Sequence, residues 1–493
     1  MKLHLRILTL FLTLILALST FAFVGCDKVE EESTIDYEDE EEEEGEDYFP
    51  DIEKKDYNSD FYMYLMEATC TPSFFIVDES NGSPMQEAVY NRQEKIKRYI
   101  GVNVIRVQRP KSMSESAYTQ LAESAIKNMD GTLDCLVSHC NMGVPRMITE
   151  NYLQDIGQMK GIDLDADYWN MDFMNSIEIN GNYFLGFSDF NILYTYVLAF
   201  NKNLLAKYES HLEKSVYDLV RDYEWTLDEM ISLASLVELD ATGDGKTLDD
   251  TYGFSARGWF DFCGILQSCD VNLMEQDESG MYQCALSSNR NFARTQTIIE
   301  KLQAFSKSNS AYLEFAWDAD HVSITTNRTL MTTHPTIQLH NLLDYSIEFG
   351  VLPFPMFDTD QANVGYRSLQ WGGYICVLSY LGDEEHQLMV GETLELLAFY
   401  SENVKITFYE KLLGKQVADV PDDAAMLEVI WDSVCIDVGL TFQDTVGTYS
   451  GLVYVVSEVA RPNSTYGGLA SFIASNENAA NKGFKKFVDG IKS

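Results

Sequence analysis

Beyond about residue 52, short apolar runs alternate with segments whose apolar residues recur at helical spacing. The first strand is predicted at 61–66 and the second at 102–107, with a helix over 87–99 between them. Another helix is predicted at 116–129, and a buried strand at 133–137 follows it. Strands that alternate with helices predict an α/β fold, in which ligand-binding loops lie at the carboxyl ends of the strands.

The same alternation continues along the rest of the chain. Residues 194–200 predict a further strand, and helical spacing covers 294–306 and 385–400. Thr226 and Glu229 form a capping box, in which the threonine hydroxyl accepts a backbone N–H at the start of a helix. No segment repeats along the chain, which argues against a solenoid or propeller. The length exceeds what one hydrophobic core usually supports, so we expect two lobes.

The N-terminal residues have a different pattern. Lys2 and Arg6 form a short basic region, and a mainly apolar run over 7–24 follows. The run ends in Phe-Val-Gly-Cys at 23–26, which looks like a lipobox, where small residues let a lipoprotein peptidase reach the bond before the cysteine. We predict that residues 1–25 are a removed signal peptide and that Cys26 carries the lipid, including palmitate. A permanent transmembrane anchor is the alternative, but the flank that follows the run is acidic rather than basic.

An acidic tract follows the predicted lipid anchor. Residues 27–51 hold 15 Asp or Glu against one Lys, in a chain whose net charge is −42. The tract has too little apolar surface to offset the entropy cost of ordering. We therefore expect 26–51 to be a disordered tether. The rest of the chain is acidic as well, which makes nucleic acid and anionic lipid poor partners. We therefore expect membrane contact through the lipid anchor only, on the extracytoplasmic face of the cell membrane.

Eight cysteines follow the predicted lipid anchor, and an even number in an exported chain permits disulfides. Cys135 with Cys140, or Cys263 with Cys269, are close enough in sequence to pair, and buried free thiols are the alternative. His139 stands beside Cys140, but the spacing matches no common zinc site.

The loop over 240–251 begins like a calcium-binding loop. Asp240, Thr242 and Asp244 stand at positions 1, 3 and 5 and Gly245 at position 6, whereas position 12 is Thr rather than Glu. Structural calcium is one prediction for this loop and an Asx-rich turn is the other. No other cofactor is expected. A nucleotide-binding loop is excluded, because position 240 would have to be Gly.

The order of these features resembles the extracellular solute-binding proteins of ABC importers, in the family 1 group that includes sugar-binding lipoproteins. The resemblance covers roughly residues 52–493. Six segments carry it: PMQEAVYNR at 84–92, INGNYFLGF at 179–187, YVLAFNKNLL at 196–205, EWTLDEM at 224–230, TGDGK through TYGF at 242–254, and GVLPFP at 350–355. One departure is MTTHP at 331–335, where many members carry an apolar-Gly-Trp pattern that supplies a stacking ring.

The resemblance implies an α/β, two-lobed periplasmic-binding-protein-like fold of type II. Each lobe would be a sheet flanked by helices, and two or three crossing strands would form the hinge. After the signal peptide (1–25) and tether (26–51), the implied parts are lobe I at 52–187, lobe II at 188–352, a return to lobe I at 353–410, and C-terminal helices shared between the lobes at 411–493.

A ligand site between the lobes is also implied. Trp259 stands where relatives place a stacking aromatic, and Trp371 lies where the chain returns to the first lobe; core packing is the alternative for both rings. Trp225 and Trp431, beside amphipathic helices, are expected in the core. The expected ligand-binding residues are Trp259, Trp371, Tyr374, Asp189, Asn191, Ser138, His139 and Asn141.

The implied function is that of a monomeric receptor that captures a small solute, expected to be a sugar, and delivers it to ABC permease subunits. No catalytic residues are predicted, because common hydrolase motifs such as Gly-x-Ser-x-Gly and His-Glu-x-x-His do not occur. One alternative is a surface-anchored carbohydrate-processing enzyme, which would need a pair of carboxylates; acidic residues are abundant enough in the chain to supply one. The other alternative is a solute-sensing domain for a membrane kinase.

Overall fold

The computed structural model describes most of the chain after the acidic tract. The described residues are 49–65, 75–80, 82–107, 115–128, 131–140, 142–191, 195–240, 243–314, 322–408, 421–447, 451–461 and 463–491. The predicted signal peptide, the Cys26 anchor, nearly all of the tether, Asn141 and Thr242 lie outside them. Residues Pro50–Ser493 group as one compact unit. Among the described helices, none combines the length and apolar character that crossing a bilayer requires.

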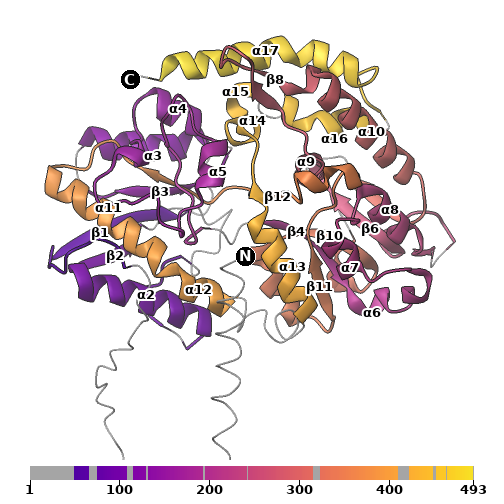
Figure 1. Ribbon diagram of the computed structural model, residues 1–493, viewed down its shortest axis with the longest axis horizontal. Helices are drawn as coiled ribbons and strands as arrows, with labels where there is room; N and C mark the ends of the chain where they lie inside the picture. The colour runs from indigo at the N-terminus through magenta and orange to yellow at the C-terminus, as the bar shows by residue number, and fades with distance from the viewer. Residues whose placement is uncertain are drawn as a thin grey trace, which may run out of the picture. The chain divides into compact units, whose positions relative to one another are not determined.

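Lobe I is built on a four-stranded sheet in the order β13-β3-β1-β2 (Figure 1). Strand β1 is parallel to β2 and β3, and β13 is antiparallel to β3. The strands are β1 Ser59–Leu65, β2 Val102–Arg106, β3 Cys135–Ser138 and β13 Tyr374–Val377, and the helices include α2 Pro84–Ile100, α3 Glu115–Asn128, α11 Glu384–Phe399 and α12 Ser401–Thr407. The predicted order of strand, helix, strand, helix, strand at the start of the chain is confirmed.

Helix α2 shows how local sequence sets its limits. Pro84 occupies its first turn after the extended Ser83, and Gly101 ends it in the left-handed region at φ 69°, donating its N–H to Lys97 O. The helix therefore begins earlier than the apolar spacing predicted. Its buried face is apolar except for one cation and comprises Met85, Val89, Arg92, Ile96 and Ile100.

Lobe II contains a mixed sheet in the order β11-β4-β10-β6-β5, with β9 also paired to β6. The strands are β4 Tyr196–Asn201, β5 Glu238–Leu239, β6 Thr251–Arg257, β9 Ala311–Glu314, β10 Thr329–Pro335 and β11 Phe349–Leu352, and the helices include α8 Leu227–Ser235, α9 Gly258–Ser268, α10 Asn289–Phe305 and α13 Pro421–Asp432. The predicted cap of α8 is confirmed, because Thr226 Oγ1 accepts the N–H of Glu229 at 3.3 Å. The divergent segment at 331–335 lies in β10, between β4 and β6.

Two of the described segments that pass between the lobes pair with each other. On the outward path, Gly186 pairs with Ile375 of β13 and Thr195 pairs with Gln370. On the return path, β12 (Ser368–Leu369) pairs in parallel with β14 (Val434–Cys435) before the chain enters β13. The outward and return paths are thus hydrogen-bonded to each other rather than separate.

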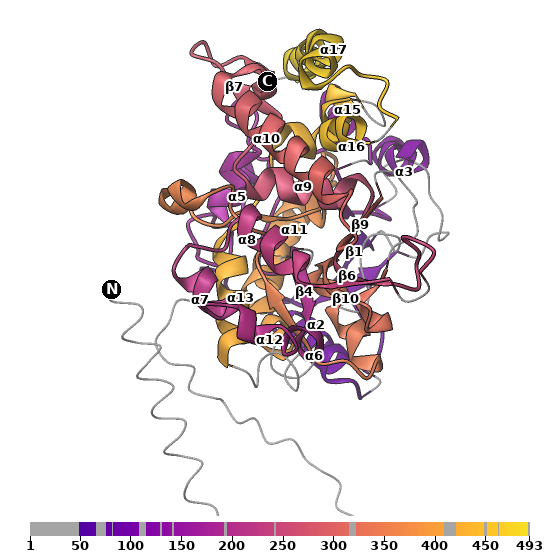
Figure 2. The same ribbon diagram turned by 90° about the vertical axis from the view of Figure 1, so that its right-hand side faces the viewer.

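The C-terminal helices contact both lobes. Helix α17 (Leu469–Gly490) packs on α4 (Val144–Thr149) of lobe I and on β8 (Tyr282–Cys284) and α10 of lobe II. It also packs on α15 (Gln443–Val446) and α16 (Val455–Ala460), and the three lie at the same end of the molecule in Figures 1 and 2.

The described cysteines are free thiols, so neither Cys135–Cys140 nor Cys263–Cys269 forms a disulfide here. Burial raises the pKa of Cys269 to about 12 and that of Cys284 to about 11, which keeps both protonated at neutral pH. Trp225 lies in the core as predicted, with its indole N–H donated to Pro353 O at 3.0 Å. Trp431 is only partly buried, against Lys405.

Candidate functional site

An aromatic cluster joins the two lobes at the crossing. Its members are His139, Trp259, Phe260, Trp371 and Tyr454. The Trp371 ring centroid lies 4.8 Å from those of Trp259 and Phe260, and 5.3 Å from that of His139, all edge to face. Trp259 also packs on Tyr454 at 4.8 Å. Both predicted ligand-binding tryptophans and the predicted histidine are therefore in one cluster.

The strand ends explain why these rings meet. His139 directly follows β3 of lobe I, and Trp259 is the second residue of α9, directly after β6 of lobe II. Both are thus at carboxyl ends of strands, where α/β folds place their ligand loops. Trp371 lies between β12 and β13 on the return path.

Gly372 lets the backbone lie against the histidine ring. It has φ +89°, and an added Cβ would lie 2.6 Å from His139 Cδ2. Paired glycines after Trp371 would allow the backbone to approach a solute closely. In this conformation the close approach is instead to His139.

The two tryptophans and the histidine of the cluster are closed to solvent, whereas Phe260 is partly buried. Trp259 and Trp371 are each 1% exposed, and His139 is 3% exposed. The indole Nε1 of Trp371 is buried with no hydrogen-bond partner among the described residues. A buried unpaired donor costs about 1–3 kcal/mol of stability, and a hydrogen-bond acceptor that entered the cluster would remove this cost.

Asn191 uses its side-chain amide within the crossing. Its Oδ1 accepts the N–H of Ser188 at 2.7 Å, and its Nδ2 donates to the carbonyl oxygen of Gly373. The residue is fully buried. In this conformation the predicted ligand-binding amide therefore joins the outward path to the return path.

Gln370 is a second amide in this crossing, and it is not among the ligand-binding residues expected from the sequence. Its Nε2 donates to the carbonyl oxygens of Asn191 at 3.3 Å and Gly372 at 2.8 Å, and its Oε1 accepts from Thr195 Oγ1 at 2.9 Å. Its place beside Trp371 was the only signal in the sequence.

Asp189 is not part of the aromatic cluster. Its carboxylate pairs with Lys405 Nζ of α12 at 2.8 Å. Together with residues 164–172 it lines a separate cavity of about 420 Å³. No member of the aromatic cluster is among the described residues that line this cavity. The structure therefore places Asp189 apart from the tryptophans.

Ser138 and Tyr374 lie beside the cluster in the sheet of lobe I. Ser138 is the last residue of β3 rather than a loop residue as predicted, and it pairs with Tyr374 of β13. Both are buried, and burial raises the pKa of the Tyr374 hydroxyl well above its usual value.

The loop after β5 is organised by its own hydrogen bonds. The Asp240 carboxylate accepts the backbone N–H groups of Gly243 and Gly245, as in an Asx turn. Among the described residues, no three His, Cys, Asp or Glu side chains group in a way that could hold a metal ion. Since Thr242 lies outside the described residues, calcium at Asp240 and Asp244 stays a prediction.

Comparison with known proteins relates the chain to others by structure alone. No family model matches it, and no curated protein matches its sequence. It is similar to a cyclo/maltodextrin-binding protein solved with maltotetraose, with a TM-score of 0.53, 12% identity, and coverage of 88% of this chain and 98% of the other. It is also similar to the maltose/maltodextrin-binding domain MalE from Bdellovibrio bacteriovorus, solved with maltotriose, with a TM-score of 0.51, 13% identity, and coverage of 87% and 98%.

These similarities confirm the predicted fold class. The chain has the α/β, two-lobed fold of maltodextrin-binding proteins, with helix-flanked sheets on either side of a crossing. At this level of identity the likeness concerns the fold.

Proposed function

We propose that this protein is the solute receptor of an ABC importer and that it binds a carbohydrate between its lobes. The observation that carries the proposal is the contact of Trp371, on the return path, with His139 of lobe I and Trp259 of lobe II. Flat aromatic faces suit the C–H surfaces of sugars, and the fold is one whose structural neighbours were solved with maltooligosaccharides.

Binding would require the lobes to separate. The rings of the cluster cover one another in the present conformation, so a sugar reaches Trp259 and Trp371 only after hinge bending. A sugar hydroxyl would then accept the Trp371 N–H, and the ring faces would stack on the pyranose. Closure around the sugar would restore the burial that the cluster has now.

The lipid anchor, the acidic tether and the permease complete the proposal. A lipid on Cys26 would hold the receptor at the extracytoplasmic face, and tethering raises its effective concentration near the permease. The tether over 26–51 would supply reach for docking and release. As a receptor the protein would act as a monomer, without catalytic residues.

The test is a titration of the full-length chain with maltotriose and maltotetraose, followed by tryptophan fluorescence and by thermal unfolding. Saturable quenching together with a rise in Tm that follows ligand concentration is the expected result. Products are analysed in the same samples, because turnover of the oligosaccharide would instead favour the carbohydrate-processing enzyme. If no mono- or oligosaccharide shifts either signal, the carbohydrate proposal is wrong.

A further inference from the structure

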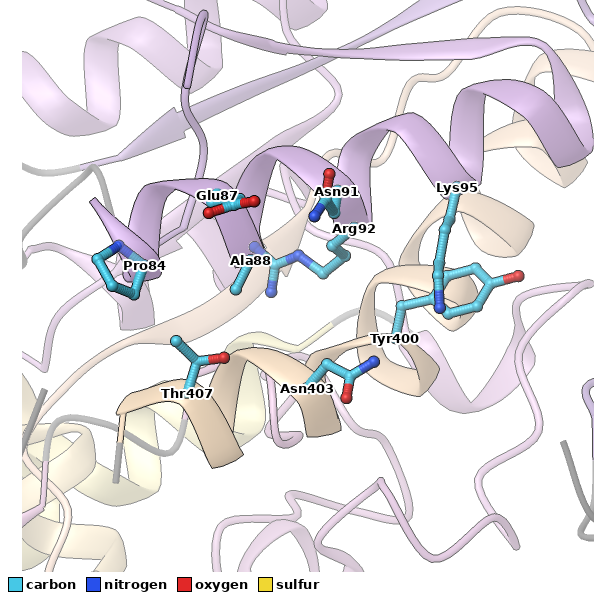
Figure 3. Close-up of a pocket in the computed structure, with 9 residues that line it drawn as sticks. All are labelled: Pro84, Glu87, Ala88, Asn91, Arg92, Lys95, Tyr400, Asn403 and Thr407. Atoms are coloured by element: carbon cyan, nitrogen blue, oxygen red, sulfur yellow. The ribbon is translucent and has the colours of Figure 1, made fainter. Parts of the chain in front are cut away.

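A second cavity lies in lobe I, away from the aromatic cluster. It has a volume of about 360 Å³ and lies between α2 and α12 (Figure 3). The residues that line it are Pro84, Glu87, Ala88, Asn91, Arg92, Lys95, Tyr400, Asn403 and Thr407. None of them belongs to the cluster, so a ligand here would bind independently of a sugar.

Arg92 is a buried cation on the wall of this cavity, and it is 2% exposed. Its Nη1 donates to Ser401 Oγ at 2.9 Å, its Nη2 donates to Phe75 O, and its guanidinium lies 4.8 Å from the Phe190 ring centroid. Its Nε has no hydrogen-bond partner among the described residues. The two hydrogen bonds are to neutral acceptors, so they leave the charge uncompensated.

No described carboxylate lies within ion-pair distance of this guanidinium, although 17 other described pairs of cation and carboxylate do form. Burial lowers the pKa of Arg92 to about 9, which still leaves it protonated at neutral pH. Because no described carboxylate balances this buried charge, an anion supplied from solution would stabilise the folded chain.

The rest of the lining suits an anion as well. Figure 3 shows Arg92 and Lys95 leaving α2 on the side that faces α12, from which Asn403 and Thr407 approach. Asn403, Thr407 and Asn91 offer neutral hydrogen-bond donors, and among the described lining residues Glu87 is the one carboxylate. Two cations against one carboxylate stand out in a chain with a net charge of −42.

We propose that this cavity is a binding site for a small oxyanion of carboxylate or phosphate chemistry. The planar guanidinium donates the remaining N–H groups of Nη1 and Nη2 to two oxygens of the anion. Lys95 adds charge at the mouth, and Asn403 and Thr407 hold the remaining oxygens. The bound anion joins α2 to α12, and Arg92, which holds it, also contacts Phe190 on the outward path.

The test uses the full-length chain, titrated separately with sodium phosphate and sodium acetate while sodium chloride keeps the ionic strength constant. Calorimetry and thermal unfolding are both recorded. Saturable heat and a rise in Tm with either anion are expected. The anion that binds more tightly shows whether the site takes a carboxylate or a phosphate. A rise in Tm that sodium chloride reproduces at equal ionic strength overturns the proposal.

Variants make the test specific to this cavity. Arg92→Met should weaken binding of the better anion by about tenfold or more, and Lys95→Met by a smaller factor. Glu87→Gln should tighten it severalfold, because a repelling carboxylate is removed. The matched control is Arg98→Met, an exposed arginine on the same helix that does not line the cavity.

Equal affinity in wild type, Arg92→Met and Lys95→Met would refute the site. If Arg92→Met fails to fold, the other two variants decide the question, because Lys95→Met should weaken anion binding and Glu87→Gln should strengthen it. Both outcomes are separate from sugar binding, which is measured at the aromatic cluster.

Discussion

Gln370 Nε2 donates a hydrogen bond to the backbone carbonyl of Asn191 at 3.3 Å, which joins the return path to the outward path. Each residue also bonds the backbone of the glycine pair after Trp371, Gln370 at Gly372 O and Asn191 at Gly373 O. The segment that carries Trp371 is therefore held by amides from both paths. We therefore expect bending at this crossing to change these hydrogen bonds.

Removing the Gln370 amide should destabilise the crossing. Gln370→Ala deletes hydrogen bonds to Asn191 O, Gly372 O and Thr195 Oγ1 and leaves buried groups unpaired, so we expect a loss of about 1–3 kcal/mol in the free energy of unfolding. Denaturant unfolding measures the change. Gln158→Ala is the control, since Gln158 is exposed. A loss of stability of equal size in this control would show that the hydrogen bonds of Gln370 do not stabilise the crossing.

Gly372 should not tolerate a side chain. Gly372→Ala places a Cβ 2.6 Å from the His139 ring at a φ of +89°, so strain and overlap add. Gly365 is a matched control, because it has φ +82° with nothing within 4 Å of its added Cβ. We expect Gly365→Ala to cost about 1–2 kcal/mol and Gly372→Ala to cost about 1–3 kcal/mol more. An equal fall in Tm in the two variants would show that overlap with the His139 ring does not add to the loss of stability.

The tryptophans of the cluster should govern sugar affinity. Trp371→Ala and Trp259→Ala should each weaken maltotetraose binding by about 1–3 kcal/mol if the rings stack on the sugar. Fluorescence or calorimetric titration measures this, and circular dichroism checks that each variant folds. The exposed Tyr345→Ala serves as the control. Unchanged affinity in both tryptophan variants would assign the rings to core packing alone.

His386 should make stability depend on pH. Its Nε2 lies 2.7 Å from Asp134 Oδ1, and this hydrogen bond to the carboxylate raises the pKa of His386 above its usual value despite partial burial. A raised folded-state pKa stabilises the protein fully below the unfolded-state pKa, about 6.5, and the gain is lost as pH rises through the folded-state value. His386→Gln should therefore destabilise the chain more at acid pH than at alkaline pH.

Unfolding by denaturant at several pH values checks this. The exposed His211→Gln is the control and should show little difference across the range. A loss of stability in His386→Gln that does not change with pH would mean that the pair acts through packing rather than charge.

Local sequence was sufficient for much of the fold. The apolar periodicity predicted β1, β2 and β3 of lobe I together with α2, α3 and α11, and the Thr226 cap and the buried Trp225 are present as expected. These features depend on residues a few positions apart, or on burial that hydrophobicity alone favours. The element limits moved where Pro84 and Gly101 act as start and stop signals.

The tertiary structure decided which candidate residues act together. Trp259, Trp371 and His139 belong to three distant segments, and only the paired crossing paths bring their rings into contact. Asp189 and Asn191 are two positions apart, yet one pairs with Lys405 and the other bonds Gly373. Periodicity cannot specify such partners, because a polar side chain bonds whichever group the fold places within about 3 Å of it. The sequence by itself determined the elements and the fold class, and packing between distant segments determined the site.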